Sequence, residues 1–325
     1  MNYQIVATLG PSSATESTWQ AMLATGVTAF RLNTSHLSLP ELDLWIGRLG
    51  CFLAGRDPRL PVILDLQGSK WRLGQFPAWE LAPGQRVALV CAASVDHSGV
   101  LPVPHPDFFR AASGSSGEIV LNDAKLRLRL ESQDGQSLHA CVITGGPIMP
   151  RKGITYAASI YRQESLNDMD RAILARTQHL EGFRFALSYV KDAVEMANYR
   201  KQVARPAYLI AKLERQPAVD EAMQVAESAD EMWLCRGDLG AELGMKAMAA
   251  TVYRFSERLA AFPVPVLLAG QIFEHMTEHP TPTRSEVCMA YAALMQGYHG
   301  LVLSEETAIG RDPVESCRMA ALLRS

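Results

Sequence analysis

The sequence predicts an α/β fold in which eight βα units close into a (β/α)8 TIM barrel, with a small β-barrel-like lid domain inserted after the third strand. Apolar runs of strand length alternate with amphipathic helical stretches along most of the chain, which is the pattern of a parallel sheet. Eight such units are the number that closes a barrel. Between residues 74 and 154 the pattern changes to short alternating segments separated by Gly, Pro, Asp and Ser turns, as in a separate β domain.

The barrel strands are the apolar runs of four to eight residues that turn residues or helical stretches bound on both sides. The predicted strands are residues 4–9, 28–33, 61–66, 183–187, 208–213, 231–235, 265–269 and 300–304. A helix is predicted after each, at residues 17–25, 39–54, 168–179, 193–204, 217–228, 246–261, 283–296 and 313–323.

These elements divide the chain into two predicted domains. Residues 1–73 and 155–325 form the barrel, and residues 74–154 form the inserted β domain. Loops that follow barrel strands at their carboxyl ends lie on the active-site face, so an insertion after the third strand is placed to act as a lid. A decorative insertion is the alternative.

The composition is that of a soluble enzyme. Of 325 residues, 48% are hydrophobic and 20% are charged, and the net charge of −3 gives no general attraction to nucleic acid or to an anionic membrane. No run of 18 apolar residues and no signal-peptide pattern occurs, so we expect a cytoplasmic protein. The six cysteines lack C-x-x-C spacing and are expected to be reduced core residues.

Two central segments, residues 210–214 and 234–240, each place charged residues at the carboxyl end of an apolar run. Glu214 and Asp238 could supply oxygen ligands to Mg2+, or to Mn2+ in its place, and leave positions free for substrate oxygens. Lys212 could stabilise a transferring phosphoryl group or an enolate. Arg236 opens a predicted helix whose free N–H groups would favour a carboxylate or phosphate. Ordinary strand-end charges with solvated heads are the alternative.

In this order, the segments of the chain resemble the pyruvate kinase family. The resemblance runs collinearly through residues 5–12, 30–36, 65–72, 121–123, 151–153, 210–214, 234–240, 280–286 and 304–308. It implies the catalytic barrel and lid of that family, and the transfer of a phosphoryl group between phosphoenolpyruvate and ADP.

The resemblance also assigns roles residue by residue. The implied catalytic cations are Lys212, Arg31 and Arg72. The implied substrate-binding residues are Arg236, Gly237, Asp238, Gly270 and Gln271. The implied nucleotide-binding residues are Asn33, His36, Arg72, Lys152 and Ser304, and the implied metal ligands are Glu214 and Asp238. A structural ion pair at Arg31, an ordinary loop histidine at His36 and a solvated turn at Lys152 are the alternatives.

One variation concerns the monovalent cation. Asn33, Ser35 and Asp65 match the family's K+ shell, but Leu66 and Lys70 stand where members that require K+ carry a threonine and a glutamate. The ammonium group of Lys70 places one positive charge among the same oxygens. We therefore expect that K+ is not required.

Other positions depart from the family pattern. Gly270 stands where the family has a threonine hydroxyl near the substrate, a loss that would impair the protonation of enolpyruvate or make room for a larger substrate. The chain stops after the eighth helix, so the family's carboxy-terminal regulatory domain and its allosteric control are expected to be absent. A homodimer through the barrel surface around Arg284 is left open.

The leading hypothesis is a Mg2+-dependent phosphotransferase acting on phosphoenolpyruvate or a related enol phosphate and a nucleoside diphosphate. A metal-dependent 2-oxo acid enolate enzyme, such as an aldolase, lyase or decarboxylase, would use the same carboxylates. The retained cations Arg31, Arg72 and Lys152 argue against it, because only a polyphosphate needs them. A non-catalytic relative that binds a metabolite or protein is the third hypothesis.

Overall fold

The computed structural model describes residues 2–54, 60–113, 117–122, 125–134, 137–156, 162, 165–203 and 206–324, and these form two compact units. Unit 1 comprises Met1–Gly68, Leu166–Arg236 and Ala250–Ser325, and unit 2 comprises Ser69–Ser165 and Gly237–Ala249. The domain boundaries predicted from the sequence lie inside unit 2, at residues 74 and 154, and place residues 237–249 with the barrel.

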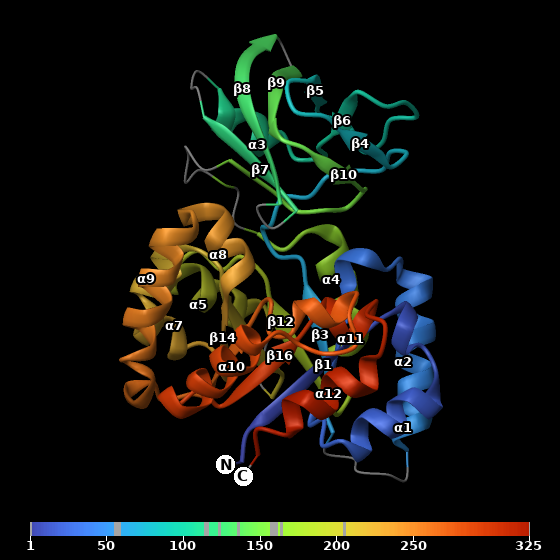
Figure 1. Ribbon diagram of the computed structural model, residues 1–325, viewed down its shortest axis with the longest axis vertical. Helices are drawn as coiled ribbons and strands as arrows, with labels where there is room; N and C mark the ends of the chain where they lie inside the picture. Colours follow the sequence, from blue (N-terminus) through green and yellow to red (C-terminus); the bar gives the residue numbers. More distant parts are fainter. Residues whose placement is uncertain are drawn as a thin grey trace. The chain divides into compact units, whose positions relative to one another are not determined.

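Eight parallel strands of unit 1 form a closed barrel in the order β1-β16-β15-β14-β13-β12-β3-β2. Figure 1 draws this barrel together with the helices that surround it. They are β1 (Gln4–Leu9), β2 (Ala29–Asn33), β3 (Val62–Leu66), β12 (Phe183–Leu187), β13 (Tyr208–Leu213), β14 (Glu231–Cys235), β15 (Val266–Ala269) and β16 (Gly300–Leu303). The predicted TIM barrel is confirmed, and every predicted strand agrees with the structure to within one residue at each end.

Helices follow the strands, as the sequence pattern predicts. They are α1 (Glu16–Ala24), α2 (Leu39–Leu53), α4 (Asp168–Thr177), α5 (Ala193–Gln202), α6 (Gln216–Asp220), α7 (Ala222–Ala226), α8 (Arg236–Leu243), α9 (Met245–Ser256), α10 (Arg284–Gln296), α11 (Glu305–Ala308) and α12 (Pro313–Ala321). Reciprocal capping boxes, Ser38 with Glu41 and Thr283 with Glu286, fix the starts of α2 and α10.

Two predicted helices differ from the structure. The helix predicted at residues 217–228 is broken at Glu221, whose ψ of 20° leaves the helical region, so that α6 ends and α7 begins there. The helix predicted at residues 246–261 ends at Ser256 and is followed by a 3-10 turn at Leu259–Ala261. Ala204, the last residue of another predicted helix, lies outside the described residues.

Unit 2 contains the β domain predicted after the third barrel strand. A six-stranded sheet has the order β11-β7-β8-β9-β5-β6, and β10 pairs with β4. These are β4 (Trp79–Leu81), β5 (Arg86–Val90), β6 (Val100–Pro102), β7 (Glu118–Leu121), β8 (Leu126–Asp134), β9 (Ser137–Thr144), β10 (Gly146–Ile148) and β11 (Ile154–Tyr156), with the helix α3 (Pro106–Ala112). Its core includes Trp71, Phe108 and Leu128. Asp123 of the family motif lies outside the described residues.

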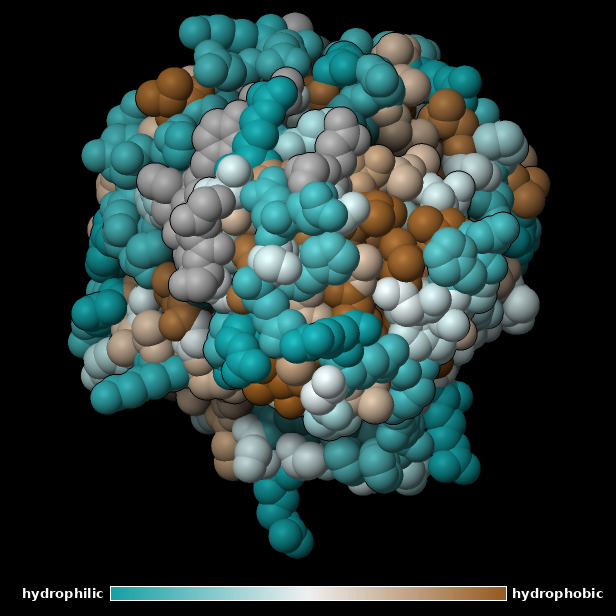
Figure 2. Space-filling view, turned by 90° about the horizontal axis from the view of Figure 1, so that it is seen from above, coloured by the Kyte–Doolittle hydropathy of each residue, from teal (hydrophilic) through white to brown (hydrophobic). Residues whose placement is uncertain are grey.

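The expectation that the cysteines are core residues is wrong for most of them. All six are free thiols, but only Cys235 and Cys317 are buried, while Cys51 and Cys288 are exposed. In the face seen in Figure 2, hydrophilic residues predominate and hydrophobic ones appear in small groups. None of the described helices is both long enough and apolar enough to cross a membrane.

The close packing of β1 against β16 in the barrel can be tested by a substitution. Gly300 pairs with Gln4, and a Cβ at Gly300 would lie 2.5 Å from the Gln4 carbonyl oxygen. Gly300→Ala should therefore push the two strands apart and lower the free energy of unfolding by about 1–3 kcal/mol. Urea denaturation measures the change.

The control for this experiment is Gly47→Ala in the exposed face of α2, where a Cβ would meet nothing within 4 Å. This substitution should raise stability by about 0.5–1 kcal/mol, because alanine favours the helix. Equal losses in both variants would contradict the account of the barrel seam.

Candidate functional site

The candidate site is the polar layer that continues the apolar interior of the barrel. Inner positions such as Ile63 and Ile210 belong to one buried cluster, and the side chain two residues further along a strand points to the same face. Ile63 is followed in this way by Asp65, and Ile210 by Lys212. The side chains reached by this step at the carboxyl ends of the strands include Thr8, Arg31, Asp65, Ser188 and Lys212.

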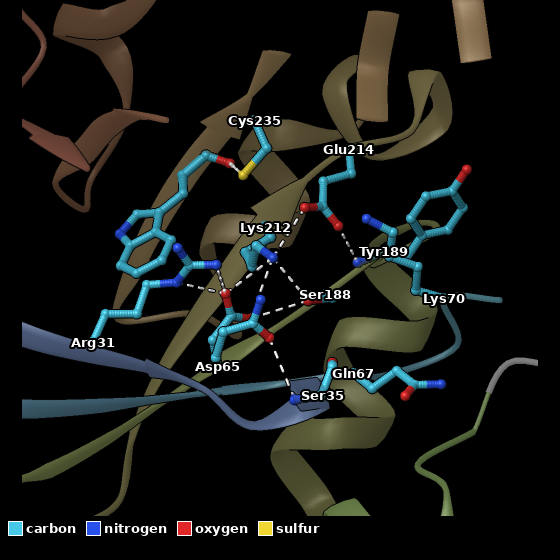
Figure 3. A network of polar contacts seen from close by, with 12 residues as sticks. Arg31, Ser35, Asp65, Gln67, Lys70, Ser188, Tyr189, Lys212, Glu214 and Cys235 are labelled. Carbon is cyan, nitrogen blue, oxygen red and sulfur yellow. Dashed lines mark hydrogen bonds and ion pairs between the residues drawn. The ribbon is translucent and has the colours of Figure 1, made fainter. Parts of the chain in front are cut away.

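Lys212 lies at the centre of this layer (Figure 3). Its Nζ is 3.2 Å from Asp65 Oδ1, 3.0 Å from Glu214 Oε1 and 2.8 Å from Ser188 Oγ. All four residues are buried. Burial lowers the pKa of Lys212, but the negative charges of Asp65 and Glu214 outweigh it and raise the pKa above its ordinary value. Lys212 is therefore a fixed positive charge at neutral pH.

Asp65 holds two cations in place. Arg31 donates from Nε to Asp65 Oδ2 at 2.7 Å and from its second nitrogen to Thr8 Oγ1 at 2.9 Å, and Lys212 contacts Asp65 from the other side. Burial raises the pKa of Asp65, but the charges of Lys212 and Arg31 overcome that effect and hold the pKa at about 2. The carboxylate therefore orients both cations through the whole neutral range.

The backbone near Lys212 positions two of the residues that contact it, Glu214 and Ser188. Tyr189 has a positive φ of 65°, and its N–H donates to Glu214 Oε2 at 2.7 Å. Gly68 also has a positive φ, and a Cβ there would lie 2.2 Å from the Ser188 carbonyl oxygen. A strained tyrosine and an obligatory glycine thus position Glu214 and Ser188.

The predicted monovalent-cation residues are only partly brought together. Asn33 is the register partner of Asp65, and the Asn33 side chain accepts a hydrogen bond from the Ser35 N–H. The Asp65 carboxylate is engaged by Arg31, Ser188 and Lys212. In unit 2, the Lys70 ammonium forms a buried ion pair of 2.6 Å with Asp238 Oδ2. The replacement of K+ by Lys70 remains a prediction.

The two predicted metal ligands lie in different units, Glu214 in unit 1 and Asp238 in unit 2. Both carboxylates are buried, which suits them to a cation. Among the described residues there is no group of three or more His, Cys, Asp or Glu side chains that could hold a metal ion. Magnesium commonly binds through one or two carboxylates plus water and substrate oxygens, so carboxylates of this kind suit Mg2+, and the binding of one ion by both residues stays a prediction.

Arg236 fixes the turn after β15. Its Nε donates to the Gly270 carbonyl at 3.0 Å and its terminal nitrogen donates to the Gln271 carbonyl at 2.9 Å. Gly270 and Gln271 both have positive φ, at 84° and 56°, so the guanidinium holds a strained turn. Another Arg236 nitrogen lies 2.9 Å from Met289 Sδ. The three predicted substrate residues Arg236, Gly270 and Gln271 are thus in contact.

Unit 2 brings the predicted phosphate-binding residues Arg72 and Lys152 to neighbouring segments of the chain. Arg72 forms a β-bridge with Gly153, and its side chain donates to the Arg151 carbonyl at 2.9 Å. The Arg72 N–H donates to His105 Nε2 at 3.1 Å. Burial lowers the pKa of His105 to about 4, so the ring is neutral and accepts this bond at neutral pH.

The two remaining nucleotide-side predictions occupy loop positions of unit 1. His36 is exposed at the end of the 3-10 turn Thr34–His36. Ser304 is the residue before α11, and its N–H donates to the buried Glu306 carboxylate at 2.9 Å. Their shared role in binding a nucleotide stays a prediction.

Comparison with known proteins decides the family. A family model described as pyruvate kinase, barrel domain, matches residues 1–317. The chain belongs to the pyruvate kinase family. Pyruvate kinase of Methylorubrum extorquens is 31% identical over 316 residues, covering 96% of this chain and 66% of the relative. One of Agrobacterium vitis is 30% identical with the same coverage, and that of Aeropyrum pernix is 31% identical, covering 99% of this chain and 70% of the relative.

The pyruvate kinase resemblance stated from the sequence is therefore confirmed, although the chain spans only 66% of the length of the first two relatives. Sequence reasoning missed several residues that contact the predicted site residues, among them Thr8, Ser188, Tyr189 and His105. Thr8 and Ser188 could have been found by stepping two residues beyond the inner apolar positions of β1 and β12. His105 gave no such signal, because the loop that carries it has no period.

Charge balance around Asp65 sets a test at neutral pH. Asp65→Asn would leave the buried charges of Arg31 and Lys212 without their shared carboxylate, so the free energy of unfolding should fall by about 3–5 kcal/mol. As a control, Asp43→Asn removes only an exposed ion pair with Arg176 and should cost at most about 1 kcal/mol. Losses of the same size in both variants would contradict the assignment.

The same residue predicts an acid dependence. A carboxylate whose pKa is lower in the folded protein than in the unfolded chain stabilises the fold at every pH above its unfolded-state pKa. That stabilisation is lost as the pH falls to the folded-state pKa, which is about 2 for Asp65. The unfolding free energy should therefore drop by about 2 kcal/mol more in the parent than in Asp65→Asn between pH 4 and pH 2. Chemical denaturation across this pH range measures the difference in slope.

Proposed function

We propose that this chain catalyses Mg2+-dependent phosphoryl transfer between phosphoenolpyruvate, or a related enol phosphate, and a nucleoside diphosphate. Membership of the pyruvate kinase family gives the reaction class. The observation that carries the proposal is the buried ammonium of Lys212, which is held by Asp65, Glu214 and Ser188. A charge fixed in advance stabilises a transition state without having to reorganise during the reaction.

In this proposal, the cations of unit 1 bind the transferring phosphoryl group, and those of unit 2 bind the phosphates of the nucleotide. Lys212 would stabilise the charge on the transferring phosphoryl group and on the enolate oxygen. Arg31, oriented by Asp65 and Thr8, would bind phosphoryl oxygens through its planar guanidinium. Arg72 and Lys152 would bind the nucleotide phosphates, and the hydrogen bond that the Arg72 guanidinium donates to the Arg151 carbonyl limits the entropy lost on binding.

Glu214 and Asp238 would hold the divalent cation, Mg2+ or Mn2+. When bound, it would supply Lewis-acid stabilisation to the phosphoryl and enolate oxygens. The amides of Gly237 and Asp238, in the first turn of α8, would bind the substrate carboxylate, as the helix dipole favours. The turn at Gly270 and Gln271 would line the substrate. Because Gly270 lacks the threonine hydroxyl of the family, an enol phosphate larger than phosphoenolpyruvate would also fit.

The proposal also covers the residues that contact the nucleotide and the oligomeric state. Asn33, His36 and Ser304 would contact the nucleotide, and a homodimer would form through the barrel surface around Arg284. The proposed ligands are a small-molecule substrate and a nucleotide.

A coupled assay with phosphoenolpyruvate, ADP and saturating Mg2+ tests the proposal. The parent should produce pyruvate and ATP, and Lys212→Met should lower kcat by roughly 100-fold or more, because the preorganised charge is lost. Lys212→Arg keeps the charge and should retain the fold, which circular dichroism checks. The exposed Lys201→Met is the matched control and should leave kcat unchanged.

Two results would reject phosphoryl transfer. One is the absence of pyruvate formation with each nucleoside diphosphate tried at saturating metal. The other is exchange of solvent deuterium into the methyl group of pyruvate without nucleotide and with no ADP binding, which would favour an enolate enzyme. Unchanged turnover in Lys212→Met would favour a protein in which the site is not catalytic.

The cation preference gives a separate prediction. Turnover of the parent should not depend on K+, because the Lys70 ammonium supplies a buried positive charge next to Asp238. Lys70→Met should slow turnover in Na+ buffer about tenfold or more, and K+ should recover part of the loss. The exposed Lys246→Met, in the same unit, is the control. A parent that requires K+, or a Lys70→Met variant as fast as the parent without K+, would contradict this role.

A further inference from the structure

Two histidines lie on one turn of backbone in the loop between β15 and α10. His275 belongs to the 3-10 turn Glu274–Thr277, and the His279 N–H donates to the His275 carbonyl at 3.0 Å. A hydrogen bond from residue i+4 to residue i is the α-helical bond, and it places the two side chains on the same face. Neither residue matches a motif of the candidate active site.

The two imidazole rings are stacked on each other. Their centroids are 3.8 Å apart and their planes differ by 8°. His279 is exposed and His275 is half-buried, so water and ions reach the pair.

Hydrogen bonds fix which nitrogen of each ring is free for a ligand. His275 Nδ1 lies 2.8 Å from the Thr281 carbonyl oxygen, and His279 Nδ1 lies 3.2 Å from the His275 carbonyl oxygen. A carbonyl oxygen can only accept, so Nδ1 of each ring carries a proton and Nε2 is the nitrogen available to a ligand. In metal-binding histidines a carbonyl on one ring nitrogen commonly leaves the other nitrogen for the ion. Because the two ring planes here are nearly parallel, at least one ring must turn out of the stack before both Nε2 atoms can reach one ion.

We propose that His275 and His279 form a binding site for one divalent transition-metal ion of the Zn2+, Ni2+ or Cu2+ class. The two Nε2 atoms would be the protein ligands and water would complete the coordination. Imidazole nitrogen suits these ions, whereas Mg2+ prefers oxygen, so the site selects a different metal from the proposed phosphotransferase site. Binding exchanges the ring stacking for two metal–nitrogen bonds.

The surroundings support binding of a cation at this turn. Glu286 Oε1 accepts a hydrogen bond from the His275 N–H at 2.9 Å, so a carboxylate lies against the same backbone. The other oxygen of Glu286 is used by the capping box with Thr283, which keeps this carboxylate in place. The site would therefore tie the turn after Gly270 and Gln271 to the start of α10.

Isothermal titration with Ni2+ tests the site. The parent chain should show one binding event per chain that His275→Asn and His279→Asn each weaken about tenfold or more, because either change removes half of a chelate. Asparagine is the substitution of choice, since its amide N–H can replace the Nδ1 donor while Nε2 is lost. The fold should therefore survive, which circular dichroism checks.

The control is His139→Asn, which changes a lone exposed histidine of β9 and should leave Ni2+ affinity unchanged. Mg2+ should give no heat that depends on either histidine of the pair, and Mg2+-dependent phosphoryl transfer should be the same in parent and variants. Absence of a Ni2+ binding event, or an event of equal affinity in the His275→Asn/His279→Asn double variant, would overturn the proposal. These outcomes are independent of whether phosphoryl transfer is found.

Discussion

The ammonium group of Lys212 inside the barrel is the interaction on which the candidate site depends. A buried ammonium is costly unless opposite charges compensate for the lost water, and Asp65 and Glu214 do so here at about 3 Å. Asp65 and Lys212 come from strands β3 and β13, which β12 separates in the barrel. Barrel closure and parallel register must therefore both be correct before the charges can meet.

The same charges link stability to function. Asp65 neutralises Arg31 and Lys212 in the free protein, and these are the cations that the proposed reaction needs. Holding these charges in place also requires backbone strain. Tyr189 has a positive φ, and for a residue other than glycine this conformation costs of order 1–3 kcal/mol. The Tyr189 N–H bond to Glu214 shows what the strain achieves, because it orients a predicted metal ligand.

Sequence reasoning predicted the barrel well because the strands carry their signal locally. The bounds of β13, which carries Lys212, and of β14, which ends at Cys235, were both predicted correctly, because buried parallel strands are continuous hydrophobic segments in the sequence. Side-chain partners were harder to predict. That Lys70 pairs with Asp238 depends on residues 168 positions apart, and the break at Glu221 depends on one backbone angle that no residue pattern encodes.

Each predicted metal ligand already has a lysine beside it, and this has a consequence for how ligands would bind. In unit 1, the formal charges of Arg31, Lys212, Asp65 and Glu214 sum to zero, and in unit 2 Lys70 balances Asp238. A divalent cation entering alone would face carboxylates whose charge is already compensated. A phosphorylated substrate brings negative charge of its own. Under the proposed function, electrostatics would thus favour binding of metal and anionic substrate together over binding of either one by itself.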